Sequence, residues 1–186
     1  MKEFFKKYGY TSVILIVDQI ALALFGFALA TATGLADNKW LQWGAGIFSV
    51  LFYLSLVYTT VWEEGSRDRI SADYNRIPRR PWLGVCIGLV SSIPNVILFI
   101  FIALGNFITL FEGIGGACKV IALLFEGMYT GLLTIRIGDS PLNTMWWAYF
   151  VIILPLIITT FLGYFAGFHN FRIIPQGKKE IEQIKR

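Results

Sequence analysis

Four long apolar stretches constrain what this chain can fold into. They cover residues 13–35, 41–62, 82–104 and 145–168, and each supplies the ~20 mostly apolar residues that a helix needs to cross the hydrocarbon core of a bilayer. Backbone polar groups in hydrocarbon must be satisfied internally, so such segments cross as helices. The sequence therefore predicts an all-α integral membrane bundle with four transmembrane helices.

Tryptophan placement and composition support this prediction. Indole rings favour the headgroup level of a bilayer, and all six tryptophans lie at or next to the ends of the apolar stretches. Hydrophobic residues make up 56% of the chain and charged residues 15%, which is hard to reconcile with a water-soluble domain. Little chain remains outside the apolar stretches, so we expect residues 1–186 to form a single membrane domain.

The distribution of Lys and Arg predicts the orientation. Of the 16 such residues, three lie in the N-terminal tail, five in the loop 63–80 and five in the tail 169–186. Because cytoplasmic loops carry an excess of Lys and Arg, we expect these three regions, and hence both termini, to be cytoplasmic in a multi-pass protein of the cell membrane. Charges that flank apolar segments are not the clustered patch of a nucleic-acid binder, so no nucleic-acid partner is expected.

A fifth apolar segment, residues 117–135, carries Lys119 and Glu126. A charge at the centre of a membrane helix costs roughly 2.5–3.5 kcal/mol on insertion scales, and a fifth crossing would export the basic tail. Lys119, Glu126 and Thr130 share one stripe on a helical wheel. We therefore predict an amphipathic or re-entrant helix on the outer side, with five transmembrane helices as the alternative.

Two prolines inside apolar stretches are candidates for function. Pro94 and Pro155 each lack an amide donor, which is expected to leave the carbonyls of Val90 and Val151 unpaired. Paired interrupted helices can mark the substrate site of a transporter, and Asn95 adds a hydrogen-bonding group at that depth. The alternative is that both prolines are ordinary kinks and Asn95 bonds to a neighbouring helix.

Ionisable residues at membrane depth are the other candidates. Asp18 could hold a cation or proton, or pair with a loop arginine near the inner surface. Lys119 and Glu126 could line a polar cavity or face outer water. The complete candidate polar membrane site is Asp18, Pro94, Asn95, Lys119, Glu126 and Pro155.

Three G-x-x-x-G patterns predict close helix approach, within the bundle first and in self-association second. Their members are Gly84, Gly88, Gly127, Gly131, Gly163 and Gly167.

Enzyme signatures are missing from the sequence. His169 is the single histidine, and Cys86 and Cys118 have neither metal-ligand nor redox spacing. Nucleophile-elbow, zinc-protease and phosphate-loop motifs are also missing. We therefore expect no catalytic residue, no metal and no cofactor.

Three short motifs carry a resemblance to a known group of proteins. They are the segment 62–69 (WEEGSRDR), the break 93–95 (IPN) and the closing segment 163–168 (GYFAGF). Together they resemble an uncharacterised family of small multispanning membrane proteins of Gram-positive bacteria. The resemblance implies a bacterial membrane protein and brings no activity with it.

These observations lead to two functional hypotheses. The first is a non-catalytic accessory or structural component that contacts the lipid bilayer and packs against itself or a larger membrane partner. The alternative is a small transporter or channel with its site at the proline-interrupted helices.

Overall fold

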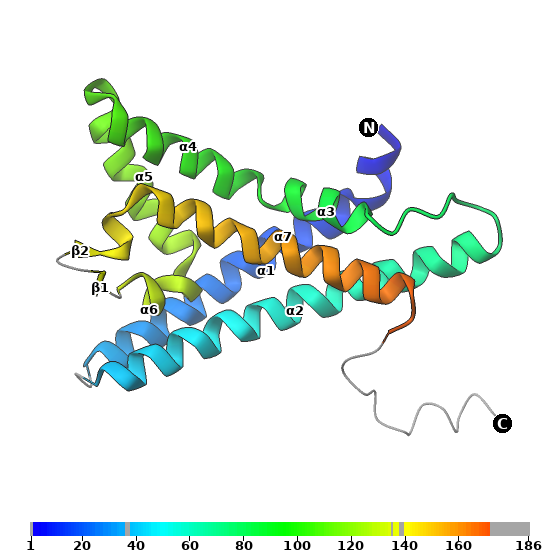
Figure 1. Ribbon diagram of the computed structural model, residues 1–186, viewed down its shortest axis with the longest axis horizontal. Helices are drawn as coiled ribbons and strands as arrows, with labels where there is room; N and C mark the ends of the chain where they lie inside the picture. Colours follow the sequence, from blue (N-terminus) through cyan, green and yellow to red (C-terminus); the bar gives the residue numbers. More distant parts are fainter. Residues whose placement is uncertain (1, 36–37, 135, 138–139, 172–186) are drawn as a thin grey trace.

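The computed structural model describes residues 2–35, 38–134, 136–137 and 140–171, and nearly all of them are helical (Figure 1). The expected all-α class is confirmed. The principal helices are α1 (Lys2–Leu35), α2 (Lys39–Asp73), α3 (Leu83–Ser91), α4 (Ile93–Phe107), α5 (Glu112–Phe125), α6 (Thr130–Leu133) and α7 (Trp146–Phe168). Short elements complete the fold: η1 (Thr109–Phe111), η2 (Gly127–Tyr129), η3 (Leu142–Thr144) and the antiparallel strands β1 (Arg136–Ile137) and β2 (Ser140–Pro141).

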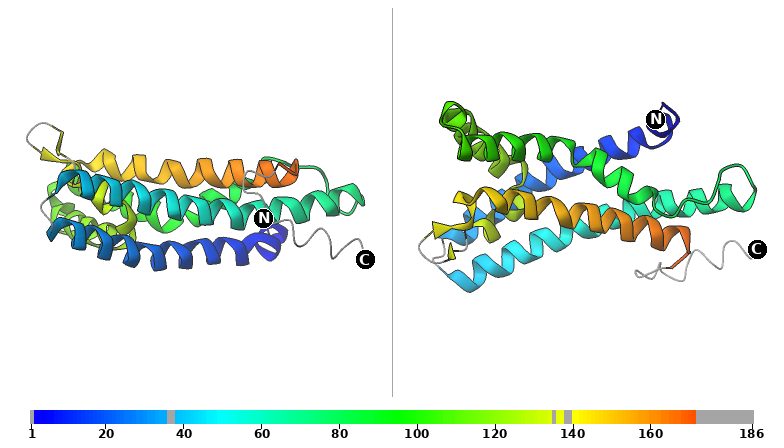
Figure 2. Two further views of the ribbon diagram at one scale, coloured as in Figure 1. Left: turned by 90° about the horizontal axis from the view of Figure 1, so that it is seen from below. Right: turned by 45° about the horizontal axis from the view of Figure 1, so that its top comes forward.

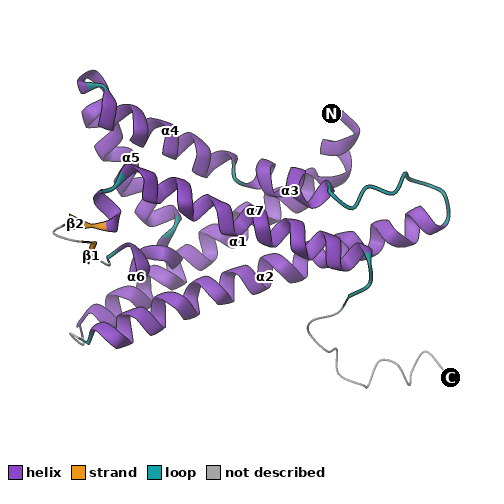
Figure 3. Ribbon diagram, in the orientation of Figure 1, coloured by secondary structure: helices purple, strands orange, loops and turns teal. Residues whose placement is uncertain are grey.

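Three described helices, α1, α2 and α7, are individually long and apolar enough to cross a membrane. Two bent pairs qualify only when each is counted as one span. The first joins α3 to α4 across a 56° bend, and the second joins α5 to the η2–α6 segment across an 84° bend. Both breaks appear as short loop segments inside the bundle (Figure 3). The described residues therefore hold three to five candidate membrane-spanning segments.

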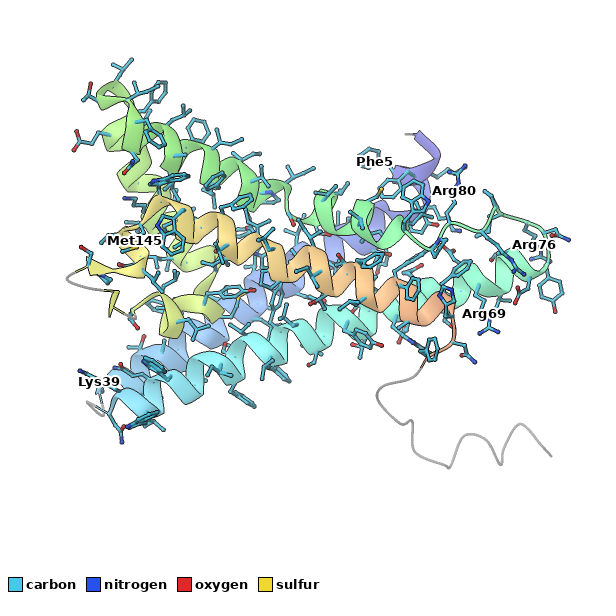
Figure 4. All side chains as sticks on the ribbon, viewed as in Figure 1. Phe5, Lys39, Arg69, Arg76, Arg80 and Met145 are labelled. Carbon is cyan, nitrogen blue, oxygen red and sulfur yellow. The ribbon has the colours of Figure 1, made fainter. Side chains whose placement is uncertain are left out.

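The bundle has two chemically different ends. One end, here called the basic end, holds the start of α1, the loop from Tyr74 to Trp82 and the end of α7 (Figure 1). Arg69, Arg76 and Arg80 lie there, whereas Lys39 lies at the opposite end (Figure 4). That opposite end, the hairpin end, holds the end of α1, the start of α2, the α4–α5 turn and the β1–β2 hairpin.

Helix α2 continues well beyond the expected apolar stretch 41–62. Asn38 begins it by accepting hydrogen bonds from the amides of Trp40 and Leu41. Past the apolar stretch, Arg67 pairs with Glu64 at 3.1 Å, and Arg69 lies 3.7 Å from Asp73. Such i,i+3 and i,i+4 pairs favour the helical conformation in water, and they account for the extension at the basic end.

Helix α7 packs against α2 and α3, and glycines allow the close approach. The carbonyls of Tyr58 and Trp62 in α2 lie against Gly163 and Gly167, respectively. Gly84 and Gly88 of α3 lie against Thr160 of α7. A side chain at any of these glycines would meet a neighbouring helix, so a small residue is needed at each crossing.

The segment from α5 to α6 is re-entrant with respect to the bundle. Near the hairpin end α5 packs on α4 with the backbones of Gly105 and Gly115 in contact. At the innermost point Gly127 lies against the carbonyl of Ala23 in α1, and α6 then returns along α2 with Gly131 against Gly46. The segment thus enters and leaves at the same end (Figure 2).

The prediction of one continuous helix over residues 117–135 is wrong. Helix α5 ends at Phe125, Glu126 caps it, and the chain turns sharply before α6. The turn is tightly packed, because the backbone of Met128 lies directly against Gly26 of α1. Tertiary packing at this glycine therefore sets the break, which helical periodicity does not reveal.

Candidate functional site around Glu126

Glu126 lies at the tip of the re-entrant segment, and its carboxyl group is buried. The residue is 3% exposed, and its backbone amide donates to the carbonyl of Ala122. The side-chain atom Oε2 has no hydrogen-bond partner among the described residues, and no described Lys or Arg forms an ion pair with it. Burial without a partner is costly for the ionised form of this group. Glu126 does not face outer water, which was one expectation for it.

Tyrosine hydroxyl groups lie near this carboxyl group. Tyr53 of α2 and Tyr129 of η2 are both neighbours of Glu126, and the hydroxyl of each is buried without a partner among the described residues. Ser49 lies one turn before Tyr53 on the same buried face of α2. Its hydroxyl lies beside Gly26 of α1, at the point where the backbone of Met128 also packs. We call Ser49, Tyr53, Glu126 and Tyr129 the Glu126 site.

Asp18 approaches the same site from α1. It is partly buried and lies near Tyr53. The alternative pairing of Asp18 with a loop arginine is not seen in the described part of the chain, where Arg67 pairs with the acidic residues beside it and Arg69 and Arg79 pair with Asp73. Two carboxyl groups, those of Asp18 and Glu126, thus lie near one tyrosine.

Asn95 lies nearby but is occupied by a neighbouring helix. The Gln19 amide donates to Asn95 Oδ1 at 3.0 Å, and both side chains are buried. Gln19 lies one turn before Ala23, the residue whose carbonyl contacts Gly127, directly after Glu126. The pair therefore forms a polar bridge between α1 and α4 about one helical turn from the Glu126 site.

The two prolines behave differently from each other and from expectation. Pro94 stands in the first turn of α4, just after the break at Ser92. The carbonyl of Val90 accepts a backbone N–H at the end of α3, so the expectation that it lacks a donor is wrong. Helix α7 runs unbroken through Pro155. A matching pair of interrupted helices is consequently not formed.

Lys119 lies in a different pocket, away from the Glu126 site. It lines a pocket of ≈ 560 Å³ between α4 and α5 at the hairpin end, together with Asn106 and Glu112. Its Nζ donates to the carbonyl of Thr144 at 3.3 Å. Lys119 and Glu126 therefore do not share one cavity, although they lie on one stripe of an ideal helix.

A smaller pocket lies at the hairpin end, between the ends of α1, α2 and α6. It has a volume of ≈ 210 Å³, and its lining includes Gly34, Gln42, Thr130 and Gly131. The hydroxyl of Thr130 is itself buried without a partner among the described residues. Because Thr130 directly follows Tyr129, this pocket reaches the immediate neighbourhood of the Glu126 site.

A second buried carboxylate, Asp68, was missed by sequence reasoning. It lies at the basic end, where Lys7 Nζ is 2.6 Å from Oδ1 and the hydroxyls of Tyr8 and Tyr164 donate to Oδ2 at 2.5 and 2.7 Å. We call these four residues the Asp68 cluster. The sequence held one signal for the burial of Asp68. It falls at helical spacing after Val57, Val61 and Gly65, and so lies on the same face of α2, which is buried. The residues around Asp68 in this part of α2 are mostly polar, so the sequence alone does not indicate a buried face there.

Metal-binding groups and reactive side chains give no alternative site in the described residues. No set of three or more His, Cys, Asp and Glu residues is arranged there to hold a metal ion. Cys118 is buried, and His169 lies at the basic end with its ring near Phe165. The chemistry on offer is therefore that of carboxyl and hydroxyl oxygens.

Comparison of the chain with protein-family models, with curated proteins and with solved structures finds no match. The functional interpretation accordingly rests on the chemistry of the Glu126 site.

Proposed function

We propose that this protein is a small transporter or channel of the cell membrane, with its polar site at Glu126. A single observation carries the proposal: a carboxyl group lies buried at the tip of a re-entrant segment without a partner among the described residues. Ionisable residues at membrane depth are expensive and usually mark a path for ions, protons or substrates. Irregular backbone at that depth is tolerated where it is covered by protein or lines a cavity.

The proposal includes a membrane topology. Helices α1, α2 and α7 and the bent pair α3–α4 cross the bilayer, and the α5–α6 segment enters from the outer side and returns to it. Both termini are then cytoplasmic, in agreement with the Lys and Arg residues of the N-terminal tail, the 63–80 loop and the 169–186 tail. In the described residues, the position of Arg69, Arg76 and Arg80 at one end supports this orientation (Figure 4).

The accessory role receives less support. It relied on glycine-bearing helix faces that would remain free for a partner. All six of those glycines lie against helices of the same chain, as the contacts of Gly127 with Ala23 and of Gly167 with Trp62 illustrate. A partner would have to use another surface. A purely structural bundle also gains nothing from the cost of burying an unpaired Glu126.

Flux measurements in proteoliposomes test the proposal. The probes are radioactive Na⁺ and Rb⁺ and a pH-sensitive dye for protons, each compared with protein-free vesicles. We expect flux of at least one of these ions, lowered roughly tenfold or more by Glu126→Gln, a change equivalent to about 1.4 kcal/mol. Asp18→Asn should also lower it, because Asp18 flanks Tyr53 in the same site.

Glu112→Gln is the matched control, since Glu112 is exposed and lines the separate α4–α5 pocket. It should leave the flux unchanged. Flux of none of the three ions above protein-free vesicles, or equal flux in the wild type and Glu126→Gln, would overturn the proposal.

A further inference from the structure

We infer that the Glu126 site binds one small monovalent metal cation, of the Na⁺ or K⁺ class, stripped of most of its water. This inference rests on the proposed function and names the substrate class of the same site. The cation would be held by the Glu126 carboxylate and by the hydroxyl oxygens of Ser49, Tyr53 and Tyr129. It would enter from the hairpin end.

The type of donor atom gives the first argument. Each of the four side chains offers oxygen, and carboxylate and hydroxyl oxygens are the hard ligands that alkali and alkaline-earth cations prefer. In the described residues, neither cysteine nor the single histidine belongs to a cluster that could hold a transition metal. Oxygen ligation therefore separates this site from zinc or copper chemistry.

The charge of the site gives the second argument. In its ionised form Glu126 contributes one buried negative charge, and Asp18, which lies near Tyr53 on α1, is only partly buried. Divalent sites such as those for Ca²⁺ collect six to eight oxygens, usually with several carboxylates. One fully buried carboxylate is balanced by a single positive charge.

A metal cation would give partners to more of the unpartnered oxygens of the site than a proton on Glu126 would. Protonation would neutralise Glu126 but would leave the hydroxyl oxygens of Tyr53, Tyr129 and Ser49 without partners among the described residues. Buried polar atoms in folded proteins nearly always have a partner. One cation at the centre of these side chains would engage their oxygens together, because each hydroxyl keeps free lone pairs.

The Asp68 cluster provides an internal comparison. There the chain also buries a carboxylate, but it supplies Lys7 as a counter-ion and two tyrosine hydroxyls as donors. Glu126 has tyrosine hydroxyls nearby and no cationic side chain paired with it in the described residues. The same fold thus satisfies one buried carboxylate from within and leaves the other to be satisfied by an external cation.

An entry route lies on the hairpin side. The ≈ 210 Å³ pocket lined by Gly34, Thr130 and Gly131 reaches the residue that follows Tyr129. Toward the basic end, the Asp68 cluster fastens α1, α2 and α7 together across the bundle. The hairpin end is therefore the side from which a cation would approach the Glu126 site, past Thr130.

Thermal unfolding of the full-length protein in detergent tests the inference. Melting temperatures are compared in NaCl, KCl and choline chloride at equal ionic strength, at two pH values on either side of neutrality. Because a ligand that binds only the folded state stabilises it by mass action, we expect Na⁺ or K⁺ to raise Tm by at least about 3 °C over choline. Glu126→Gln should abolish the difference, and Glu112→Gln should retain it.

Hydroxyl removal provides a second measurement that stands even if Glu126→Gln does not fold. Tyr129→Phe and Ser49→Ala each delete one oxygen and should raise the cation concentration for half-maximal stabilisation roughly tenfold, as expected for a loss of about 1.4 kcal/mol. Tyr10→Phe, at an exposed hydroxyl, should not change it.

The inference is overturned if Na⁺ and K⁺ stabilise no more than choline at either pH, or if the stabilisation survives in Glu126→Gln. Proton flux in vesicles together with no response to Na⁺ or K⁺ would overturn the inference and leave the transport proposal standing. Absence of flux of every probe ion would instead overturn the transport proposal.

Discussion

Lys7 and Asp68 form a 2.6 Å ion pair between α1 and α2, in which the carboxylate side chain is 2% exposed and the lysine side chain 39% exposed. Tyr8 and Tyr164 donate to the second carboxylate oxygen from α1 and α7. Hydrogen bonds to an ionised group are stronger than neutral ones. Three helices that are distant in the sequence are therefore fastened at one carboxylate.

Asp68→Asn should lower the free energy of unfolding by about 2 kcal/mol, the size expected for hydrogen bonds to a charged group. The amide has one acceptor oxygen in place of two and cannot neutralise Lys7, although the lysine side chain can still reach water. Thermal or chemical unfolding in detergent measures the change. Asp73→Asn is the control, because its pairs with Arg69 and Arg79 are exposed and should contribute within about 0.5 kcal/mol. Equal loss in both variants would contradict the structural role of the cluster.

Gly167→Ala tests the crossing of α7 over α2. A Cβ at this position would collide with the backbone carbonyl of Trp62, which cannot move aside as a flexible side chain could. Overpacking of this kind typically costs about 1–3 kcal/mol. Gly113→Ala in α5 is the matched control, since nothing lies within 4 Å of its added Cβ. The control should raise stability by up to about 1 kcal/mol through helix propensity, and both effects can be read from unfolding in detergent. Similar stability of the two variants would argue against the α2–α7 packing.

The main helices were predictable because long apolar stretches are visible directly in the sequence. The stretch 145–168 matches α7 almost residue for residue. The break at Glu126 was not predictable, since the apolar pattern of 117–135 continues helically through it. What ends the helix is the close contact of Met128 with Gly26, a residue about one hundred positions earlier in the chain.

The candidate site was predictable only in its charged and amide members. Asp18, Asn95 and Glu126 stand out because polar side chains are rare at membrane depth. Tyr53 and Tyr129 do not, because tyrosine is common in membrane proteins and its hydroxyl usually finds a partner. Only the three-dimensional arrangement shows that these hydroxyls lie buried near Glu126 without partners among the described residues.

The bridge between Gln19 and Asn95 should show energetic coupling. Asn95→Leu leaves the buried Gln19 amide without its acceptor and should cost about 1–3 kcal/mol. With Gln19→Leu added, the double variant should be more stable than the sum of the two single losses predicts, by about 1 kcal/mol. A double-mutant cycle on unfolding free energies measures this, with exposed Asn106→Leu replacing Asn95→Leu as the uncoupled control. Strict additivity of Gln19→Leu and Asn95→Leu would rule out the bridge.

Cysteine labelling distinguishes a re-entrant α5–α6 segment from a fifth crossing. In a background with Cys86 and Cys118 replaced by serine, single cysteines are placed at the exposed positions Asn38, Tyr74 and Ser140. Asn38 and Ser140 belong to the hairpin end and Tyr74 to the basic end. A membrane-impermeant maleimide added to intact cells should modify Asn38→Cys and Ser140→Cys, whereas Tyr74→Cys should react only after permeabilisation. If the segment crossed the bilayer, Ser140→Cys would react only after permeabilisation, as Tyr74→Cys does. Glu126 would then lie within a fifth transmembrane segment and not at the tip of a re-entrant one. The side on which Ser140→Cys reacts therefore decides whether the Glu126 site is approached along one membrane face or lies on a continuous transmembrane path.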